Sequence, residues 1–250
     1  MNQISWLFDL DNTLYSADSG MFDYLNKRIN MYVSNKLKLD LPYVLNIRRR
    51  YINEYCSTLL GLKNEFDVDP AEFLFFVHNI DVNTFLQKED KLKDFILSLP
   101  GEKYIVTNSP LFYAKNVLKA LGVNEIFRNI YDIEFMDYYG KPYVTSIKKV
   151  INKLGIDIRS SIFIDDSFEN IISARYLGFK TLYIYKDADY VNYYEDILFP
   201  KIRKLLFRRL VKTKENVCSG GTRMAAIQVF QSAVEPSSFF FSSDNLSFSL

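Results

Sequence analysis

Short apolar runs alternate with longer helical patterns after residue 103, and this alternation limits the possible folds more than any other feature. The apolar runs cover 103–109, 130–135, 161–164 and 180–185. The helical patterns between them cover 111–121, 144–154 and 170–177, and a glycine, a common helix terminator, follows each one. Strands that alternate with helices predict a parallel sheet with right-handed crossovers. We therefore expect an α/β fold with a doubly wound parallel sheet.

One more buried strand is predicted near the N-terminus, from the apolar residues Ile4, Trp6, Leu7 and Phe8. From about residue 20 to residue 93 hydrophobic residues recur at helical spacing instead. Asp69 followed by Pro70 is typical of a helix start. We expect a discontinuous α/β core at 1–16 and 94–200, with an α-helical cap inserted at 17–93.

Residues 201–250 have a different composition from the rest of the chain. Residues 201–214 alternate basic and apolar side chains, and the chain is rich in serine from Cys218 onward. We expect a basic helix that packs its apolar side on the core, with contact to a membrane surface or a partner as the alternative. The serine-rich part is predicted to be mostly disordered.

The composition narrows the class of protein. A formal net charge of +1 argues against binding of a nucleic acid polymer, which requires a strongly basic surface. Cys56 and Cys218 are far apart and lack metal-ligand spacing, which fits a reducing compartment. No cleavable signal and no stretch of about 20 apolar residues is present. We expect a soluble cytoplasmic protein without a membrane anchor, and its oligomeric state is not predicted.

Polar residues follow the predicted strands where each strand ends. They are Asp9 and Asp11 after the first strand, Thr107 and Asn108 after the second, Asp165 and Asp166 after the 161–164 strand, and Lys141 in a loop before a helix. In an open parallel sheet the site lies at the carboxyl ends of the strands. These side chains are therefore expected to converge on one crevice, although an Asx-turn is the simpler interpretation of the first pair.

Carboxylates and a lysine in this arrangement suggest phosphoryl transfer through an aspartyl-phosphate. We expect Asp9 to attack phosphorus and Asp11 to protonate the leaving oxygen and later deprotonate water. Mg²⁺ suits a site of few carboxylates and substrate oxygens, with Asp9 and Asp165 as ligands. Thr107 and Lys141 would hold the phosphoryl oxygens.

The four motifs resemble, in order, those of the haloacid dehalogenase superfamily. They are Asp9-Leu-Asp-Asn-Thr13, Thr107 after an apolar strand, Lys141-Pro142, and Phe163-Ile-Asp-Asp166. The resemblance covers residues 1 to about 186 and implies a phosphatase, because dehalogenases of that family lack the acid at position 11. It also implies that the backbone carbonyl of Asp11 is a magnesium ligand.

A narrower resemblance, to the pyrimidine 5'-nucleotidase subgroup, extends into the helical insertion. It rests on Thr13-Leu-Tyr15, Gly20-Met-Phe22, Arg48-Arg-Arg-Tyr51, Tyr55, Thr58-Leu59, Gly61-Leu62, Asp69-Pro70, Phe73, Val77-His78 and Ile80-Asp81. It implies that a small phosphorylated metabolite, a nucleoside 5'-monophosphate, is the substrate. The serine-rich tail lies outside the subgroup pattern. A phosphatase for sugar phosphates or phosphoglycolate is the alternative, and a phospho-ligand-binding protein without activity is a further one.

Several side chains have two open interpretations. Asn108 either contacts substrate or caps the next helix, and Asp166 either ligates the metal through water or orients its neighbours. Thr13 is expected to stabilise the turn after the first strand, and Asn170 either orients the metal site or starts its helix. His78, the single histidine, is expected to be a packed core residue.

Overall fold

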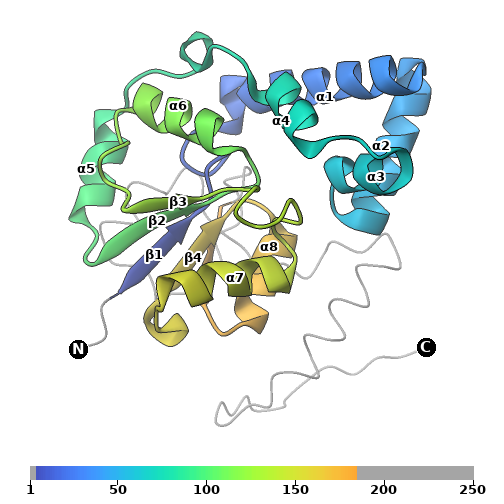
Figure 1. Cartoon of the computed structure of the whole chain (residues 1–250). Helices are drawn as coiled ribbons and strands as arrows, with labels where there is room; N and C mark the ends of the chain where they lie inside the picture. Colours follow the sequence, from blue (N-terminus) through green and yellow to red (C-terminus); the bar gives the residue numbers. More distant parts are fainter. Residues whose placement is uncertain (1–3, 185–250) are drawn as a thin grey trace, which may run out of the picture. The chain divides into compact units, whose positions relative to one another are not determined.

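The computed structural model describes residues 4–184, in which a five-stranded parallel sheet has the strand order β3-β2-β1-β4-β5 (Figure 1). The strands are β1 (Ser5–Phe8), β2 (Glu102–Val106), β3 (Asn129–Tyr131), β4 (Ile162–Asp165) and β5 (Lys180–Tyr183). The chain builds outward from β1 on one side and then returns to add β4 and β5 on the other. This reversal beside β1 is the switch point at which open α/β sheets bind ligands. The predicted doubly wound α/β fold is confirmed.

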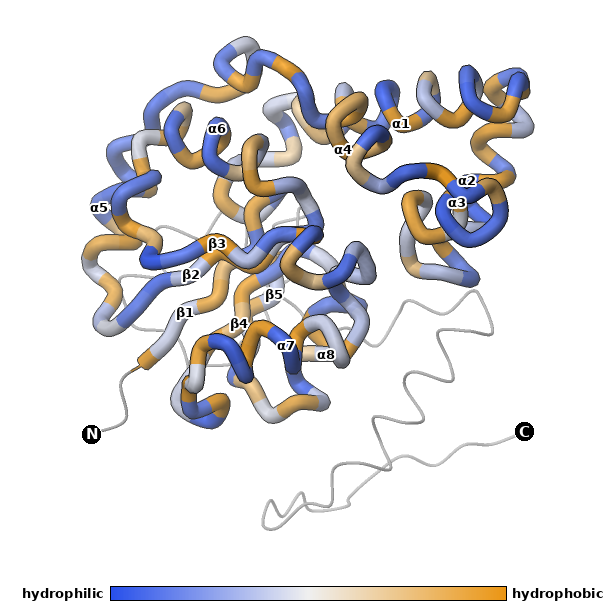
Figure 2. Tube along the Cα trace, in the orientation of Figure 1, coloured by the Kyte–Doolittle hydropathy of each residue, from blue (hydrophilic) through white to orange (hydrophobic). Residues whose placement is uncertain are grey.

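The two faces of the sheet are covered by different helices. Trp6 and Phe8 pack in one hydrophobic cluster with residues of α5 (Asp90–Ser98) and α6 (Leu111–Leu121). Leu7 points to the opposite face, where it packs with residues of α7 (Val144–Leu154) and α8 (Phe168–Tyr176). This alternation follows the two-residue period of a strand. The strands buried on both faces carry mostly hydrophobic residues (Figure 2), as expected for a parallel sheet.

Between β1 and β2 the chain forms helices joined by loops. The helices are η1 (Ala17–Ser19), α1 (Met21–Leu37), α2 (Leu41–Tyr55), α3 (Thr58–Phe66), α4 (Pro70–His78), η2 (Val82–Thr84) and α5. The Asp69 side chain accepts a hydrogen bond from the amide of Ala71, and Pro70 occupies the first turn of α4, so the predicted helix start is confirmed. The division into a core and a cap at 17–93 stays a proposal.

The predicted strand at 130–135 is too long, because the structure has a strand only at 129–131. The Asp132 side chain accepts hydrogen bonds from the amides of Leu111 and Phe135, at 3.0 and 2.9 Å. The Phe135 amide therefore bonds to a side chain instead of a neighbouring strand, and the chain turns away from the sheet. Conversely, α8 begins two residues earlier than predicted because Ser167 caps it.

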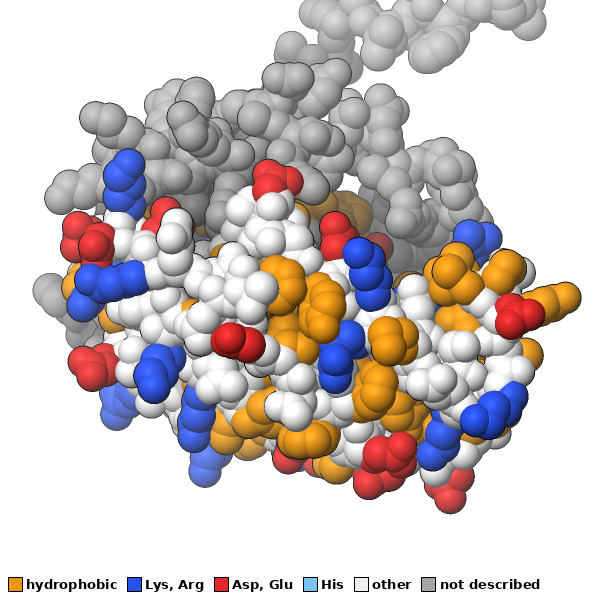
Figure 3. All heavy atoms as spheres, turned by 90° about the horizontal axis from the view of Figure 1, so that it is seen from above, with side chains coloured by type: hydrophobic (Ala, Val, Ile, Leu, Met, Phe, Trp, Pro, Cys, Tyr) orange, Lys and Arg blue, Asp and Glu red, His pale blue; other side chains and the backbone are white. Residues whose placement is uncertain are grey.

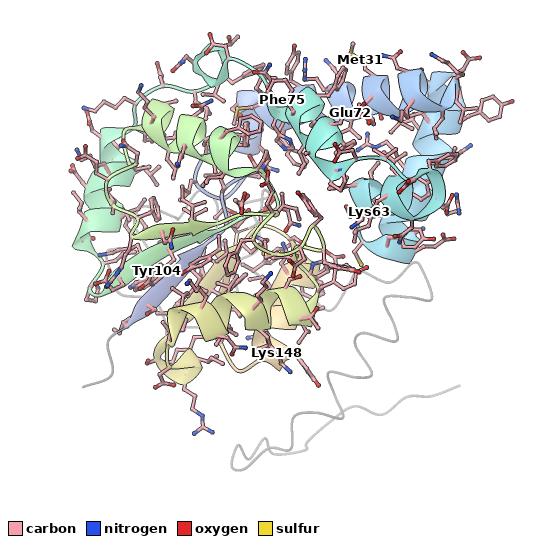
Figure 4. The ribbon with its side chains drawn as sticks, in the orientation of Figure 1. Met31, Lys63, Glu72, Phe75, Tyr104 and Lys148 are labelled. Carbon is pink, nitrogen blue, oxygen red and sulfur yellow. The ribbon has the colours of Figure 1, made fainter. Side chains whose placement is uncertain are left out.

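The helices of the insertion contact the core at several places. Tyr143 donates a hydrogen bond to the carbonyl of Tyr55 at 3.0 Å. Lys63 of α3, which is labelled in Figure 4, lies 5.7 Å from the centre of the Tyr138 ring. Exposed hydrophobic side chains lie among charged ones on the face seen from above (Figure 3). No helix among residues 4–184 is both long enough and apolar enough to cross a membrane. The predicted basic helix and serine-rich tail lie outside the described residues.

Candidate active site

Asp9 lies directly after β1, and two side chains hold its carboxylate. The hydroxyl of Thr13 donates to Oδ2 at 3.1 Å, and the ammonium of Lys141 donates to Oδ1 at 2.6 Å. The amide of Asp9 bonds to the carbonyl of Ile164 on β4, so the sheet itself positions this residue. Burial raises the pKa of Asp9, against the charge of Lys141, which lowers it. Thr13 thus contacts the candidate nucleophile in addition to lying in the turn.

Lys141 connects the ends of β1 and β4. Its buried ammonium lies 2.6 Å from Asp9 and 2.7 Å from Asp165, whose side chain is completely buried. Burial alone would favour the neutral amine, but the charges of Asp165 and Asp9 outweigh it and raise the pKa of Lys141 above its ordinary value. Lys141 therefore remains charged and links two acids in a buried ion-pair network.

The loop that carries Lys141 is fastened by the side chain of Asn108. The amide of Asn108 donates to the Lys141 carbonyl at 2.8 Å, and its oxygen accepts from the Lys141 amide at 2.8 Å. Gly140 has φ +69°, and a Cβ there would lie 2.5 Å from the Asn108 oxygen, so only glycine fits. Asn108 thus positions the lysine, which is neither of the two roles expected from the sequence. Substrate binding by Asn108 stays a prediction.

Asp165 is oriented by the first residues of α8. Its Oδ1 accepts hydrogen bonds from the Ser167 amide at 2.9 Å and from the Asn170 side chain at 2.8 Å, leaving Oδ2 for Lys141. Burial raises the pKa of Asp165 to about 6, with Lys141 opposing the shift. Asn170 therefore orients an acid of the site and also receives the helix cap from Ser167.

Asp9, Asp165 and Asp166 each offer one carboxylate oxygen within 4.8 Å of the other two. Burial, followed by the charges of Asp9 and Asp165, raises the pKa of Asp166 to about 8. Among the described residues, the Oδ1 atom of Asn12 is buried without a hydrogen-bond partner. Excess negative charge and hard oxygen donors fit a divalent cation such as Mg²⁺. The chemistry of the donor set is thus compatible with the expected cofactor.

Asp11 has a different environment from Asp9, although only Leu10 separates them. Three hydroxyl groups donate to its carboxylate: Tyr15 at 2.5 Å, Tyr113 at 2.8 Å and Ser109 at 2.5 Å. Its carboxylate does not belong to the group formed by Asp9, Asp165 and Asp166, whose oxygens are close enough to share one metal ion. β1 ends at Phe8, so the two-residue alternation of a strand does not extend to Asp11.

Thr107 lies at the end of β2 and is fully buried. Its amide bonds to the carbonyl of Tyr131, and its hydroxyl accepts from the amide of Ser109 at 3.0 Å. The loop after β2 thus folds back at Thr107 and brings Ser109 to Asp11. Phosphate binding by Thr107 and Lys141 stays a prediction.

The cap residues singled out from the sequence have structural partners. Tyr51 is fully buried and Thr58 is buried, so neither side chain is exposed on the surface. Arg48 donates to the side chains of Asn26 and Asn30. His78 is buried, which confirms the predicted core position.

Sequence reasoning missed Tyr15, Ser109 and Tyr113 as members of the site. Tyr113 follows the apolar spacing of its helix, so it has the appearance of an ordinary core residue. Ser109 was detectable, because it lies two residues after Thr107 in the same strand-end loop.

The haloacid dehalogenase-like hydrolase family matches residues 7–178. This chain belongs to that family. It is similar to Phosphate metabolism protein 8 of Saccharomyces cerevisiae, with 23% identity over 201 residues, which are 74% of this chain and 63% of the yeast protein. The chain therefore spans less than two thirds of that relative.

The fold is also similar to that of a haloacid dehalogenase family enzyme from Bacteroides thetaiotaomicron, with 21% identity and a TM-score of 0.50. The similarity covers 76% of this chain and 97% of the other. The chain thus belongs to a known family of hydrolases and has the expected fold.

Proposed function

We propose that this hydrolase is a magnesium-dependent phosphomonoesterase that acts through an aspartyl-phosphate on Asp9. The observation that carries the proposal is the position of the Asp9 carboxylate between Thr13 and Lys141, with Asp165 and Asp166 close by. A carboxylate held in this way is aimed and partly neutralised, as a nucleophile toward an anionic ester requires. Bound Mg²⁺, held by Asp9, Asp165, Asp166 and the Asp11 carbonyl, would screen charge and polarise the phosphoryl oxygens.

The residues around Asp9 have separate tasks in this proposal. Lys141 and Thr107 bind the phosphoryl oxygens, and Asn108 keeps the Lys141 backbone in place. Asp11 protonates the leaving oxygen and then takes a proton from the water that hydrolyses the phosphoenzyme. Its hydrogen-bonded surroundings favour this role over metal ligation by its carboxylate.

Nucleoside 5'-monophosphates are the proposed substrate class. The support is the resemblance of residues 13–81 to the pyrimidine 5'-nucleotidase subgroup, and the name of the yeast relative refers to phosphate metabolism. Sugar phosphates or phosphoglycolate are the alternative, because they require the same core residues and differ only in their cap contacts.

Phosphate release from a panel of nucleotides and sugar phosphates, with Mg²⁺ and with EDTA, tests the proposal. We expect release that depends on Mg²⁺ and is fastest with nucleoside monophosphates. Faster release from sugar phosphates would favour the alternative substrate class. Tight binding of phosphorylated ligands without any release would identify a binding protein instead.

A further inference from the structure

The three hydroxyl groups around Asp11 come from different parts of the chain. Tyr15 lies in the turn after β1, Ser109 in the loop after β2, and Tyr113 on α6. Tyr15 and Tyr113 share Oδ1 of Asp11, and their hydroxyl oxygens are 3.4 Å apart, whereas Ser109 donates to Oδ2. Burial, and next the charge of Asp11, raises the pKa of both tyrosines, so they remain protonated donors. Every donor thus restrains one of the two carboxylate oxygens.

His78 connects this network to the helical insertion. It is the last residue of α4, and its Nε2 lies 3.5 Å from the Ser109 hydroxyl oxygen. Its ring meets the Tyr113 ring edge-on, with centroids 5.0 Å apart. One histidine therefore contacts two of the three groups that hold Asp11.

The protonation of His78 follows from its surroundings. Its Nδ1 lies 3.0 Å from the carbonyl of Leu74, which can only accept, so Nδ1 carries the proton. Burial lowers the pKa of His78 to about 4, and the ring is therefore neutral at pH 7 with an unprotonated Nε2. Ser109 has one proton and donates it over the shorter 2.5 Å contact to Asp11, so His78 Nε2 lies beside the Ser109 oxygen without a hydrogen bond between them.

We propose that Ser109 and Tyr113 are positioning residues for Asp11, and that His78 supports them from α4 by packing its ring against Tyr113 and lying beside Ser109. The orientation of the Asp11 carboxylate then depends on how α4 packs against the core. The inference rests on the proposed function, because it assumes that Asp11 transfers the proton. Hydrogen bonds to an ionised carboxylate are about twice as strong as neutral ones, so three of them leave the side chain little freedom.

Two esters with different leaving groups show whether Tyr113 and Ser109 position the acid Asp11 or only stabilise the fold. An alkyl phosphate needs a proton on its leaving oxygen, whereas p-nitrophenolate leaves without one. We expect Tyr113→Phe to lower kcat/KM about ten-fold for a nucleoside 5'-monophosphate and less than about two-fold for p-nitrophenyl phosphate. Ser109→Ala should show the same dependence. Tyr104→Phe, at a buried tyrosine of β2 outside this network (Figure 4), should leave both values unchanged.

Variants of α4 test the part played by His78. His78→Ala should reproduce the dependence on the leaving group, and His78→Phe should recover part of the loss because it restores a ring against Tyr113. The matched control is Phe75→Ala, because Phe75 of α4 contacts Phe112 of α6, with centroids 6.0 Å apart, and does not contact the Asp11 network. Phe75→Ala should change both esters by the same factor.

Two sets of results would overturn the inference. Equal losses on both esters in Tyr113→Phe and Ser109→Ala would show a structural role, and full activity in both variants would show none. Thermal unfolding checks that each variant folds, and these two conservative changes carry the test if His78→Ala does not fold. A wild-type chain that hydrolyses neither ester would overturn the proposed function instead, and the inference with it.

Discussion

Asp9 and Asp11 are two residues apart, yet their carboxylates have opposite kinds of neighbours. Asp9 lies among charges, with Lys141 at 2.6 Å and two further acids within 4.8 Å. Asp11 lies among three neutral hydroxyl groups. A carboxylate beside a lysine and a cation site is suited to meeting an anionic ester, whereas one held by neutral donors is suited to exchanging a proton. In the proposed mechanism the different surroundings of the two acids, and not their spacing along the chain, give them separate roles.

Asp9→Asn changes the acid that lies among charged groups and should have the largest effect. We expect kcat to fall by more than about 10⁴-fold with every ester, because loss of a nucleophile abolishes the covalent route. Phosphate release under Mg²⁺ saturation measures this loss. Turnover within ten-fold of the wild type would remove Asp9 from the nucleophile role.

Asp11→Asn should lower kcat about 10²- to 10⁴-fold, the usual contribution of a general acid–base group. Unlike Asp9→Asn, this variant should still form the phosphoenzyme from p-nitrophenyl phosphate, seen as a burst of p-nitrophenolate in rapid mixing. Absence of the burst would show that Asp11, like Asp9, is needed to form the phosphoenzyme, and the proposed division of roles would be wrong.

Lys141→Met tests the charged side of the comparison through stability. It leaves buried acids without their cation, so the metal-free protein should lose about 3–5 kcal/mol of unfolding free energy. Lys149→Met is the matched control, because Lys149 pairs with Asp137 on the surface and should contribute less than about 1 kcal/mol. Urea denaturation in EDTA measures both. An equal loss of unfolding free energy in the two variants would show that the buried ion pairs of Lys141 stabilise the fold no more than a surface ion pair does.

His78, which contacts the hydroxyl groups around Asp11, should make the free energy of unfolding depend on pH. The folded-state pKa of His78, about 4, lies below the ordinary value of 6.5, so the unfolded chain binds a proton that the folded chain does not. The stability from this group is present above pH 6.5 and is lost as the pH falls from 6.5 toward 4. Between pH 7 and pH 5 the wild type should lose about 2 kcal/mol more than His78→Gln. Parallel pH profiles would contradict the assignment.

Much of the fold follows from the sequence because local patterns and tertiary packing agree there. The helices at 111–121 and 144–154 have the predicted bounds, since a glycine ends each one at positive φ. The rule that sites lie at strand ends also brought Asp9, Lys141 and Asp165 together correctly. The strand at 130–135 was overextended, because Asp132 takes an amide hydrogen bond that no periodicity can reveal.

The surroundings of Asp11 were not predictable in the same way. Tyr113 lies 102 residues from Asp11 in the chain, and its spacing on α6 is that of a core residue. Its hydroxyl reaches Asp11 only because the crossover from β2 places α6 beside the end of β1. The same applies to Asn108, whose partner Lys141 is 33 residues away.

The central claim is that Asp9, and not Asp11, carries the phosphoryl group. The most direct test incubates Asp11→Asn with p-nitrophenyl phosphate and Mg²⁺, quenches in acid, and maps the modified residue by peptide mass spectrometry after borohydride trapping. We expect one labelled residue, Asp9, and no label in Asp9→Asn. Label at another residue, or phosphate release by Asp9→Asn at the wild-type rate, would contradict it.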